Sequence, residues 1–137
     1  NLTGTWRCLK HEVRIMLAQG GGAIVNNCSI LGLNGGANAS YTATKHGIAG
    51  LTKSAAVTYA GKGVRVNAVC PGLIEAGLGL NVIRRGAEAL QKMLSLHPAG
   101  RAGSAMEVVQ AVMWLCSDEA SFVHGHLLSV DGGYSAH

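Results

Sequence analysis

Residues 23–45 read AIVNNCSILGLNGGANASYTATK. The first part, 23–28, is short and rich in apolar and β-favouring residues, which predicts a strand covered on both faces. A loop rich in glycine and asparagine follows over 30–40, and a long run of Ala, Thr and Gly from Tyr41 to about Gly61 predicts a helix. A buried strand that leads through a loop into a helix is half of a parallel crossover unit, so this stretch predicts an α/β fold.

The rest of the chain repeats the alternation of helix and apolar strand. Apolar residues between Leu2 and Leu17 recur at helical spacing on one face, and the basic residues lie outside that face. Ser104-Ala-Met-Glu107 has the pattern of a capping box, which predicts that a helix starts there. The predicted helices cover 2–17, 41–61, 87–96 and 104–117, and the predicted strands cover 23–28, 64–70 and 126–130.

Polar and turn residues follow each predicted strand. Ser29 follows the first, Pro71-Gly72 the second and Asp131-Gly132 the third. Because the carboxyl ends of parallel strands meet at one edge, where ligands of such sheets bind, we expect these residues to converge on one crevice. The glycines at 20–22 precede a strand instead of following one, which indicates a turn and not a phosphate-binding loop.

The composition is that of one folded domain and narrows the classes of function. Of 137 residues, 48% are hydrophobic and 13% are charged, and no apolar run is long enough to span a membrane. The net charge of +4 comes from basic residues spread singly along the chain, which argues against nucleic-acid binding. The four cysteines and six histidines are dispersed, so no metal site is expected, and a reducing, cytoplasmic location is the default.

Tyr41 and Lys45 are four residues apart, which makes their side chains neighbours on one face of a helix. A free tyrosine titrates at about pH 10, and an ammonium about 4 Å away would favour its phenolate by roughly 4 kcal/mol. Ser29 would donate a hydrogen bond to the same substrate oxygen. Such a set exchanges a proton with an oxygen on carbon, and hydride transfer with a nicotinamide is the natural partner step. The Tyr–Lys spacing also arises by accident in helices, so this alternative stays open.

Five segments stand in a characteristic order: Asn1-Leu-Thr-Gly, Ile24-Val-Asn-Asn-Cys-Ser29, Tyr41-x-x-x-Lys45, Arg65-Val-Asn-Ala-Val-Cys-Pro-Gly72 and Gly125-x-x-x-x-Val-Asp-Gly-Gly133. In this order and with these gaps, they closely resemble the short-chain dehydrogenase/reductase family over essentially the whole chain. The resemblance implies the C-terminal part of a Rossmann-type, three-layer α/β fold with a parallel sheet. Residues 1–137 would form part of a single domain.

The resemblance implies catalytic roles for four residues. Tyr41 matches the acid/base of the family, and Lys45 matches the lysine that lowers the pKa of that tyrosine and binds the nicotinamide ribose. Ser29 resembles the serine that orients the substrate carbonyl. Asn1 matches the asparagine that helps to hold a water in the proton relay, and an ordinary asparagine at a helix end is the alternative.

The resemblance also implies a cofactor, a substrate class and an assembly. The cofactor is NAD or NADP, and the substrate is a small secondary alcohol or ketone. Residues 73–100 resemble a substrate lid. Homodimers or homotetramers would form through the two long helices that begin near Asn1 and Tyr41. The implied cofactor-binding residues are Tyr41, Lys45, Pro71, Gly72 and Ile74.

Three departures from the family pattern are visible. The glycine-rich phosphate loop and the early strands would precede Asn1, and Ala76 stands where threonine is common. Ser29 and Tyr41 are twelve positions apart, one fewer than in many relatives. The first departure leaves a second hypothesis, an inactive truncated fragment that keeps only the scaffold and the oligomer interface. Under either hypothesis, we expect the fragment alone to show little or no turnover.

Overall fold

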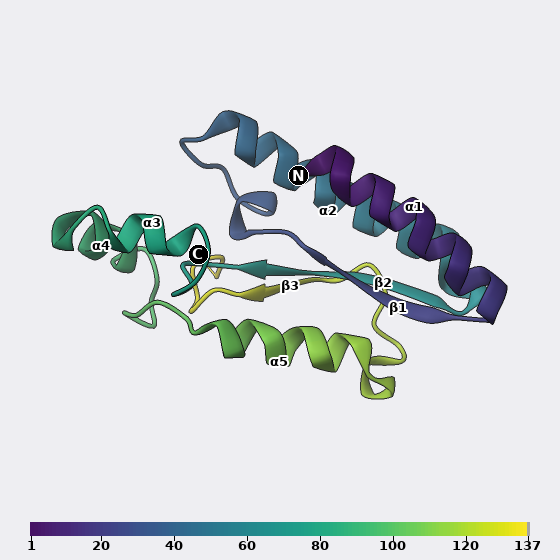
Figure 1. The fold of residues 1–137 in the computed structure, drawn as a ribbon. Helices are drawn as coiled ribbons and strands as arrows, with labels where there is room; N and C mark the ends of the chain where they lie inside the picture. The colour runs from purple at the N-terminus through teal and green to yellow at the C-terminus, as the bar shows by residue number, and fades with distance from the viewer. Residues whose placement is uncertain (137) are drawn as a thin grey trace.

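A parallel sheet of three strands runs through the centre of the computed structural model, which describes residues 1–136 (Figure 1). The last residue of the expected domain, His137, lies outside the described residues. The sheet contains β1 (Gly22–Asn27), β2 (Val64–Pro71) and β3 (Leu127–Val130), in the order β1-β2-β3. Because all pairings are parallel, the three strands end at the same edge of the sheet.

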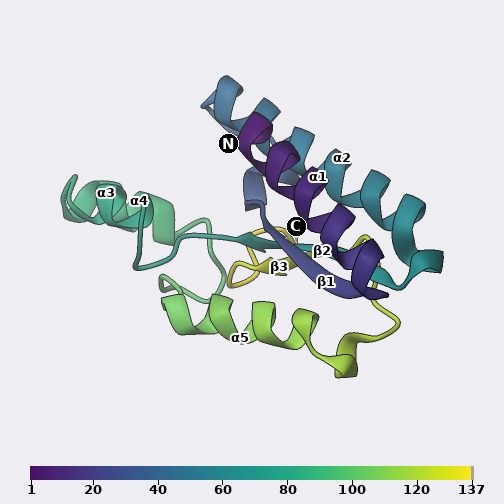
Figure 2. The same ribbon diagram turned by 45° about the vertical axis from the view of Figure 1, so that its right-hand side comes forward.

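Helices cover both faces of this sheet and give three layers (Figures 1 and 2). α1 (Leu2–Gln19) and α2 (Ala39–Tyr59) lie on one face, and α5 (Ala105–Cys116) lies on the other. The predicted α/β class with a parallel sheet is therefore confirmed. No helix in residues 1–136 is both long and apolar enough to cross a membrane. The remaining elements are α3 (Gly79–Ile83), α4 (Ala87–Leu94) and the 3-10 turns η1 (Ile30–Gly32), η2 (Ala60–Lys62) and η3 (Asp118–Ala120).

The apolar face of α1 packs against the sheet, as the helical spacing of its sequence predicts. Leu9 and Val13 of this helix are buried against Ile24 of β1 and against Val64 and Val66 of β2. Full burial of such a side chain contributes about 1.5–3 kcal/mol, so this cluster holds α1 and the first two strands together.

Glycine is required where α1 and α2 turn back into the sheet. Gly20 ends α1 in the left-handed conformation, at φ 92°. A Cβ atom on Gly21 would lie 2.7 Å from the carbonyl oxygen of Gly63, a distance that real side chains do not reach. The predicted turn is therefore present at Gly20 and Gly21, with a close backbone contact in addition, and Gly22 already begins β1.

Two polar side chains of β2 fix the elements that follow it. Asn67 is fully buried, donates to the carbonyl of Val123 at 2.8 Å and accepts from the backbone N–H of His126 at 2.9 Å. Arg65 donates to the carbonyl of Leu115 at 2.6 Å and to the two carbonyls that follow it. The last carbonyls of a helix have no partner within that helix, so Arg65 caps the C-terminus of α5.

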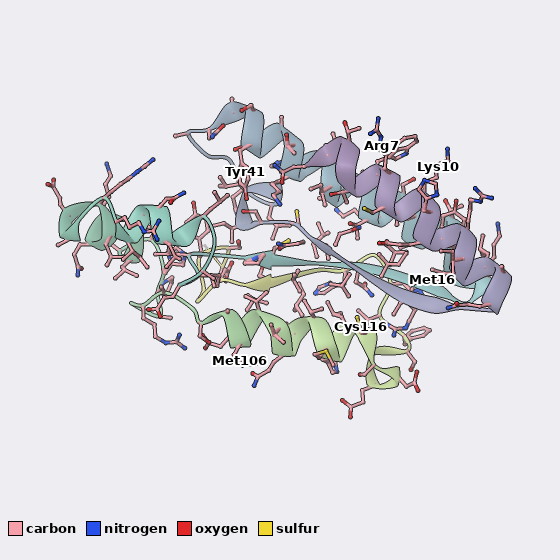
Figure 3. All side chains as sticks on the ribbon, viewed as in Figure 1. Arg7, Lys10, Met16, Tyr41, Met106 and Cys116 are labelled. Atoms are coloured by element: carbon pink, nitrogen blue, oxygen red, sulfur yellow. The ribbon has the colours of Figure 1, made fainter. Side chains whose placement is uncertain are left out.

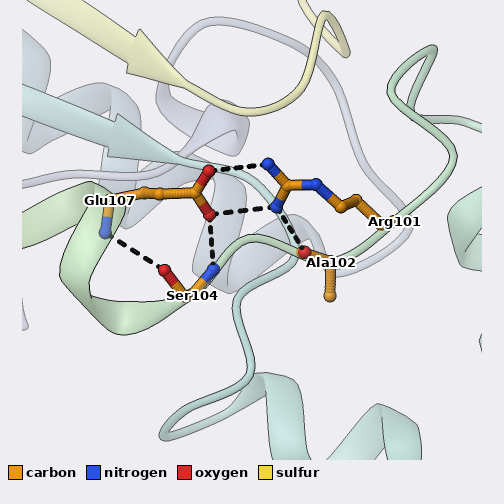
Figure 4. Close-up of polar contacts among 4 residues, drawn as sticks. All are labelled: Arg101, Ala102, Ser104 and Glu107. Atoms are coloured by element: carbon orange, nitrogen blue, oxygen red, sulfur yellow. Dashed lines mark hydrogen bonds and ion pairs between the residues drawn. The ribbon is translucent and has the colours of Figure 1, made fainter.

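The structure refines two predicted segments. The loop predicted over 30–40 begins with η1, because the hydroxyl of Ser29 accepts the N–H of Leu31 at 3.2 Å. α2 starts at Ala39, two residues earlier than predicted, because the side chain of Asn38 caps it and accepts the N–H of Tyr41. The predicted capping box of Ser104 and Glu107 is confirmed (Figure 4).

Candidate active site

All seven predicted site residues line one open cleft of about 570 Å³. The cleft lies at the carboxyl ends of β1 and β2, with α2 on one side and α5 on the other. The sequence-based expectation that the residues after these two strands converge is met. The seven residues are Asn1, Ser29, Tyr41, Lys45, Pro71, Gly72 and Ile74.

The third strand end does not reach this cleft, which corrects the expectation that all three ends share one crevice. Asp131 and Gly132 instead line a separate cavity of about 80 Å³ with His97. The backbone of Gly72 lies between the two cavities, and a Cβ on Gly72 would be 2.9 Å from the Cα of Asp131. The carboxylate of Asp131 accepts the N–H groups of Gly133 and Ser135, so it organises its own turn.

Ser29 lies two residues beyond the end of β1, at the start of η1. Its side chain is buried, with 8% of the residue exposed. Its oxygen accepts the N–H of Leu31, so the hydroxyl hydrogen is directed elsewhere and is available as a donor to a ligand in the cleft. The strand places this hydroxyl, and the 3-10 turn orients it.

Tyr41 and Lys45 lie in the first turns of α2, and both line the cleft together with Asn1, which precedes α1. Figure 3 shows Tyr41 on the N-terminal part of α2. The Nζ atom of Lys45 lies 5.5 Å from the centroid of the Tyr41 ring, so the spacing of four does bring the two side chains together. The residue Lys45 is only 5% exposed, and its Nζ donates to the carbonyl of Asn27 at 2.9 Å.

The environment of Lys45 opposes its positive charge. Burial lowers the pKa of this ammonium, and negative charge on the nearby sulfur of Cys28 acts in the other direction. An ammonium has three N–H groups, of which the Asn27 carbonyl takes one. Lys45 is therefore a buried charge that has two N–H groups left to bind a ligand. This feature is more common in binding and catalytic sites than in structural ones.

Asn1 and the segment after β2 complete the cleft. Asn1 precedes α1, and its carbonyl accepts both the N–H and the hydroxyl of Thr5, while its side chain makes no cap. Gly72 hydrogen-bonds to the carbonyl of Val130 and has no room for a side chain. Ile74 forms an isolated bridge with Gly103, which fixes the beginning of the predicted lid segment, residues 73–100.

Three groups of residues near the cleft were not predicted from the sequence. Cys28 lines the cleft, and only the strand register reveals its partner Cys70. His97 is buried beside the cleft, accepts the N–H of Leu73 at 3.1 Å and holds the base of the lid segment. The opposite wall belongs to α5, and the available signal in the sequence was a stripe of apolar residues on this helix. This stripe consists of Val108, Val109, Val112 and Met113.

Several known proteins are similar to this chain. A family model described as enoyl-(acyl carrier protein) reductase matches residues 1–135. The cis-4-hydroxycyclohexanecarboxylate dehydrogenase of Sinomonas cyclohexanicum is 51% identical over 137 residues, which cover 99% of this chain and 54% of the relative. The cyclohexanol dehydrogenase of Acinetobacter sp. (strain SE19) is 50% identical, with 99% of this chain and 52% of the relative covered.

Solved structures of dehydrogenases and reductases are also similar to this chain. Levodione reductase superposes with a TM-score of 0.94 at 36% identity, covering 98% of this chain and 55% of that chain. A gluconate 5-dehydrogenase from Burkholderia cenocepacia J2315, in complex with NADP and tartrate, gives a TM-score of 0.86 at 33% identity, with 91% and 49% covered. The chain spans about half the length of the curated relatives it matches. From the family model, these relatives and the fold, the chain belongs to the short-chain dehydrogenase/reductase family.

Proposed function

We propose that the protein containing this chain is an NAD(P)-dependent oxidoreductase that interconverts a secondary alcohol and a ketone. One observation carries the proposal: Ser29, Tyr41 and the buried Lys45 come from two separate elements and line the same cleft. The printed names of the two relatives, both dehydrogenases of ring alcohols, support the same reaction class. A hydroxyl donor, a phenol and an ammonium are the groups that proton exchange with an alcohol oxygen needs.

The residues at the cleft fit the nicotinamide riboside part of such a cofactor. The volume of about 570 Å³ lies within the range of small-molecule sites. Lys45 would donate its two remaining N–H groups to the ribose hydroxyls, and Pro71, Gly72 and Ile74 would form the wall against the ring. When bound, the nicotinamide supplies or accepts the hydride.

The side chains of this chain would handle the proton. In the reducing direction, Tyr41 would give its proton to the developing alkoxide, while the hydroxyl of Ser29 donates a hydrogen bond to the same oxygen. The positive charge of Lys45 would stabilise the negative charge left on the tyrosine oxygen. Asn1, which also lines the cleft, would hold a water through which the proton is restored.

An apolar ring is the substrate class that the cleft favours. Ile74 and Leu78 of the lid segment line it, and α5 adds Val109 and Met113 from the other side. The described cleft offers these side chains as its apolar surface, so an alicyclic alcohol would bury its ring there and present its hydroxyl to Tyr41.

The replacement Tyr41→Phe tests this proposal in the full-length protein. It removes the exchangeable proton and keeps the ring, so turnover should fall roughly a hundred- to ten-thousandfold while the dissociation constant of the nicotinamide cofactor stays nearly unchanged. Steady-state kinetics and fluorescence titration measure the two quantities. Tyr59→Phe is the matched control, because Tyr59 ends the same helix and packs in the core. Turnover of Tyr41→Phe within a few-fold of the parent would contradict the role of Tyr41.

Self-association through α1 and α2 is the proposed assembly, as homodimer or homotetramer. The outer surface of these helices carries a shallow cavity of about 460 Å³ lined by Leu2, Trp6 and Leu51. On the same side of α2, Val57 is 86% exposed, and a Cβ on Gly50 would meet nothing within 4 Å. An apolar surface with such small residues lets another helix approach closely.

A further inference from the structure

Cys28 and Cys70 lie opposite each other across β1 and β2. The register pairs Asn27 with Val69, and the N–H of Cys28 donates to the carbonyl of Val69 at 2.9 Å. This bond extends the parallel ladder by one residue, so Cys28 is directly opposite Cys70. Opposite residues point to the same face, and both cysteines belong to the buried cluster with Ile48 under α2.

The spacing of the two cysteines suits a covalent link. Neighbouring strands lie about 4.8 Å apart, which is inside the range of roughly 4.4–6.8 Å that the Cα atoms of a disulfide span. A Cβ on Gly32 would overlap the sulfur of Cys28, so glycine at this position makes the space that the thiol occupies. Both thiols are free in this structure.

The two sulfurs differ in access and in acidity. Cys28 is among the residues that line the cleft and is 3% exposed, whereas Cys70 is fully buried beside it. Hydrogen bonding from the Cys70 thiol lowers the pKa of Cys28 to about 6, against the opposing effect of burial. The same hydrogen bond and burial raise the pKa of Cys70 above the ordinary range. Cys28 is thus the reactive thiolate, and Cys70 is the thiol held beside it.

We propose that Cys28 and Cys70 form a peroxide-sensitive dithiol that closes to a disulfide at the floor of the cleft. The Cys28 thiolate attacks one oxygen of hydrogen peroxide and becomes a sulfenic acid, and hydroxide leaves. The Cys70 thiol then attacks that sulfur, the S–S bond forms, and water leaves. In sum, two thiols lose two electrons and two protons, and one peroxide becomes two waters.

The link would reach the proposed active site through its neighbours. In its thiol form, Cys28 donates from its sulfur to the carbonyl of Lys45 at 3.3 Å, a bond that its thiolate cannot make. Cys28 directly precedes Ser29, and Cys70 directly precedes Pro71. Drawing the sulfurs to a bond of about 2.05 Å shifts both strand ends and breaks the contact with Lys45. A misplacement of this size costs on the order of a hundredfold in rate. This consequence for turnover rests on the proposed function, whereas disulfide formation does not.

Peptide mass mapping of the full-length protein tests the chemistry. The protein is treated with hydrogen peroxide, unfolded, and alkylated at its remaining thiols before digestion. We expect a Cys28–Cys70 linked peptide that dithiothreitol abolishes, and its loss in Cys70→Ala, where Cys28 carries sulfenic or sulfinic acid instead. The double variant Cys8→Ala/Cys116→Ala is the matched control and should keep the link, since these exposed cysteines lie on α1 and α5. Figure 3 labels Cys116. Full alkylation of both cysteines after peroxide, or a stable sulfinic acid on Cys28 beside free Cys70 in the parent protein, would overturn the proposal.

Turnover measured on the same samples separates this inference from the proposed function. Peroxide should lower the rate on the order of a hundredfold in the parent protein, and dithiothreitol should restore it. In Cys70→Ala, dithiothreitol should restore less of the lost rate, because a sulfinic acid is not reduced by thiols. A disulfide that forms without changing a measurable rate would remove the regulatory consequence. A protein without turnover that still forms the disulfide would contradict the proposed function alone.

Discussion

Lys45 carries a positive charge in the interior of the protein, where the residue is only 5% exposed. Its Nζ donates a hydrogen bond to the carbonyl of Asn27. Removing an ammonium from water is costly, and one neutral hydrogen bond offsets that cost only in part. Burial accordingly lowers the pKa of this side chain. A group retained at such a cost is better explained by activity than by stability.

The replacement Lys45→Met separates activity from stability. In the full-length protein, this replacement keeps the length of the side chain and removes the charge, so we expect turnover to be lost while the melting temperature rises by about 2–4 °C, the shift that roughly 1 kcal/mol produces in a larger domain. Differential scanning calorimetry and steady-state kinetics measure both. Lys53→Met on the exposed side of α2 is the control and should change neither. A melting temperature below that of the parent would mean that Lys45 stabilises the fold.

Among individual residues, the sequence predicts some members of the candidate site and misses others for a physical reason. Tyr41 and Lys45 follow from helical periodicity, which is a local property. The Cys28–Cys70 pair depends on the register between two strands that are separated by a whole helix. His97 depends on how the lid segment folds back on Leu73. Spacing along the chain carries no information on such contacts.

Helix α5 is held at its two ends by different means. Arg65 of β2 donates to its last carbonyls, and the capping box of Ser104 and Glu107 satisfies its first N–H groups. Arg101 adds an ion pair to Glu107, with 2.7 Å between Nη2 and Oε1 (Figure 4). The hydrogen bond from Arg101, followed by that from the N–H of Ser104, lowers the pKa of Glu107 to about 2.

The low pKa of Glu107 predicts a pH dependence of stability. Because its pKa is depressed from 4.5 in the unfolded chain to about 2 in the folded one, its stabilisation is complete above the unfolded value and is lost as the pH falls towards the folded value. Glu107→Gln keeps the capping geometry and removes the charge. The melting temperatures of parent and variant should differ most above about pH 5 and should converge towards about pH 2.

Control measurements make this prediction specific. Added salt should reduce the difference in melting temperature between the parent and Glu107→Gln. Arg101 is largely exposed, so salt screens its ion pair with Glu107. The parallel variant Glu119→Gln, in η3, should follow the pH profile of the parent. A difference in melting temperature between the parent and Glu107→Gln that stays constant from about pH 6 to about pH 2 would contradict the ion-pair explanation.

Element boundaries were predictable where a local signal marks them. The capping box marks the start of α5, and glycine marks the end of α1. The early start of α2 was missed although Asn38 is a good cap, because the surrounding glycines and asparagines read as one loop. The turn η1 was missed because it depends on the hydroxyl of Ser29, which the sequence-based interpretation assigned to chemistry alone.

At the scale of the whole molecule, exposed apolar side chains gather on the outer side of α1 and α2. Trp6 and Val57 stand on the outer side of α1 and α2, and they are 48% and 86% exposed. Among residues 1–136, no charged residue lines the shallow cavity between these helices. The proposed self-association would bury this surface.

Charge placed on that surface tests the assembly. In the full-length protein, Trp6→Glu combined with Val57→Glu should shift the sedimentation coefficient to that of a monomer, because a buried unpaired carboxylate is costly. Ile15→Glu, on the opposite side of α1 and 63% exposed, is the matched control and should leave the assembly intact. An unchanged oligomer in the double variant would place the interface elsewhere.

The lid segment leaves the sheet and returns to it at nearly the same point. The carbonyl of Leu73 accepts the N–H of Gly103, and the carbonyl of Gly103 accepts the N–H of Glu75. These bonds join backbone to backbone and require no particular side chain beyond the small residue at Gly103. Lengthening a closed loop twofold costs only about 0.6 kcal/mol.

The segment between these bonds is therefore an exchangeable module. Grafting residues 76–96 of a relative with another substrate onto this framework should change substrate preference and leave the melting temperature within a few degrees, as competition kinetics and calorimetry would measure. A graft that unfolds the sheet would show that the module and the framework are not independent. If they are independent, a family can diversify its substrates by replacing one loop, while the strand ends that carry the proton chemistry stay as they are.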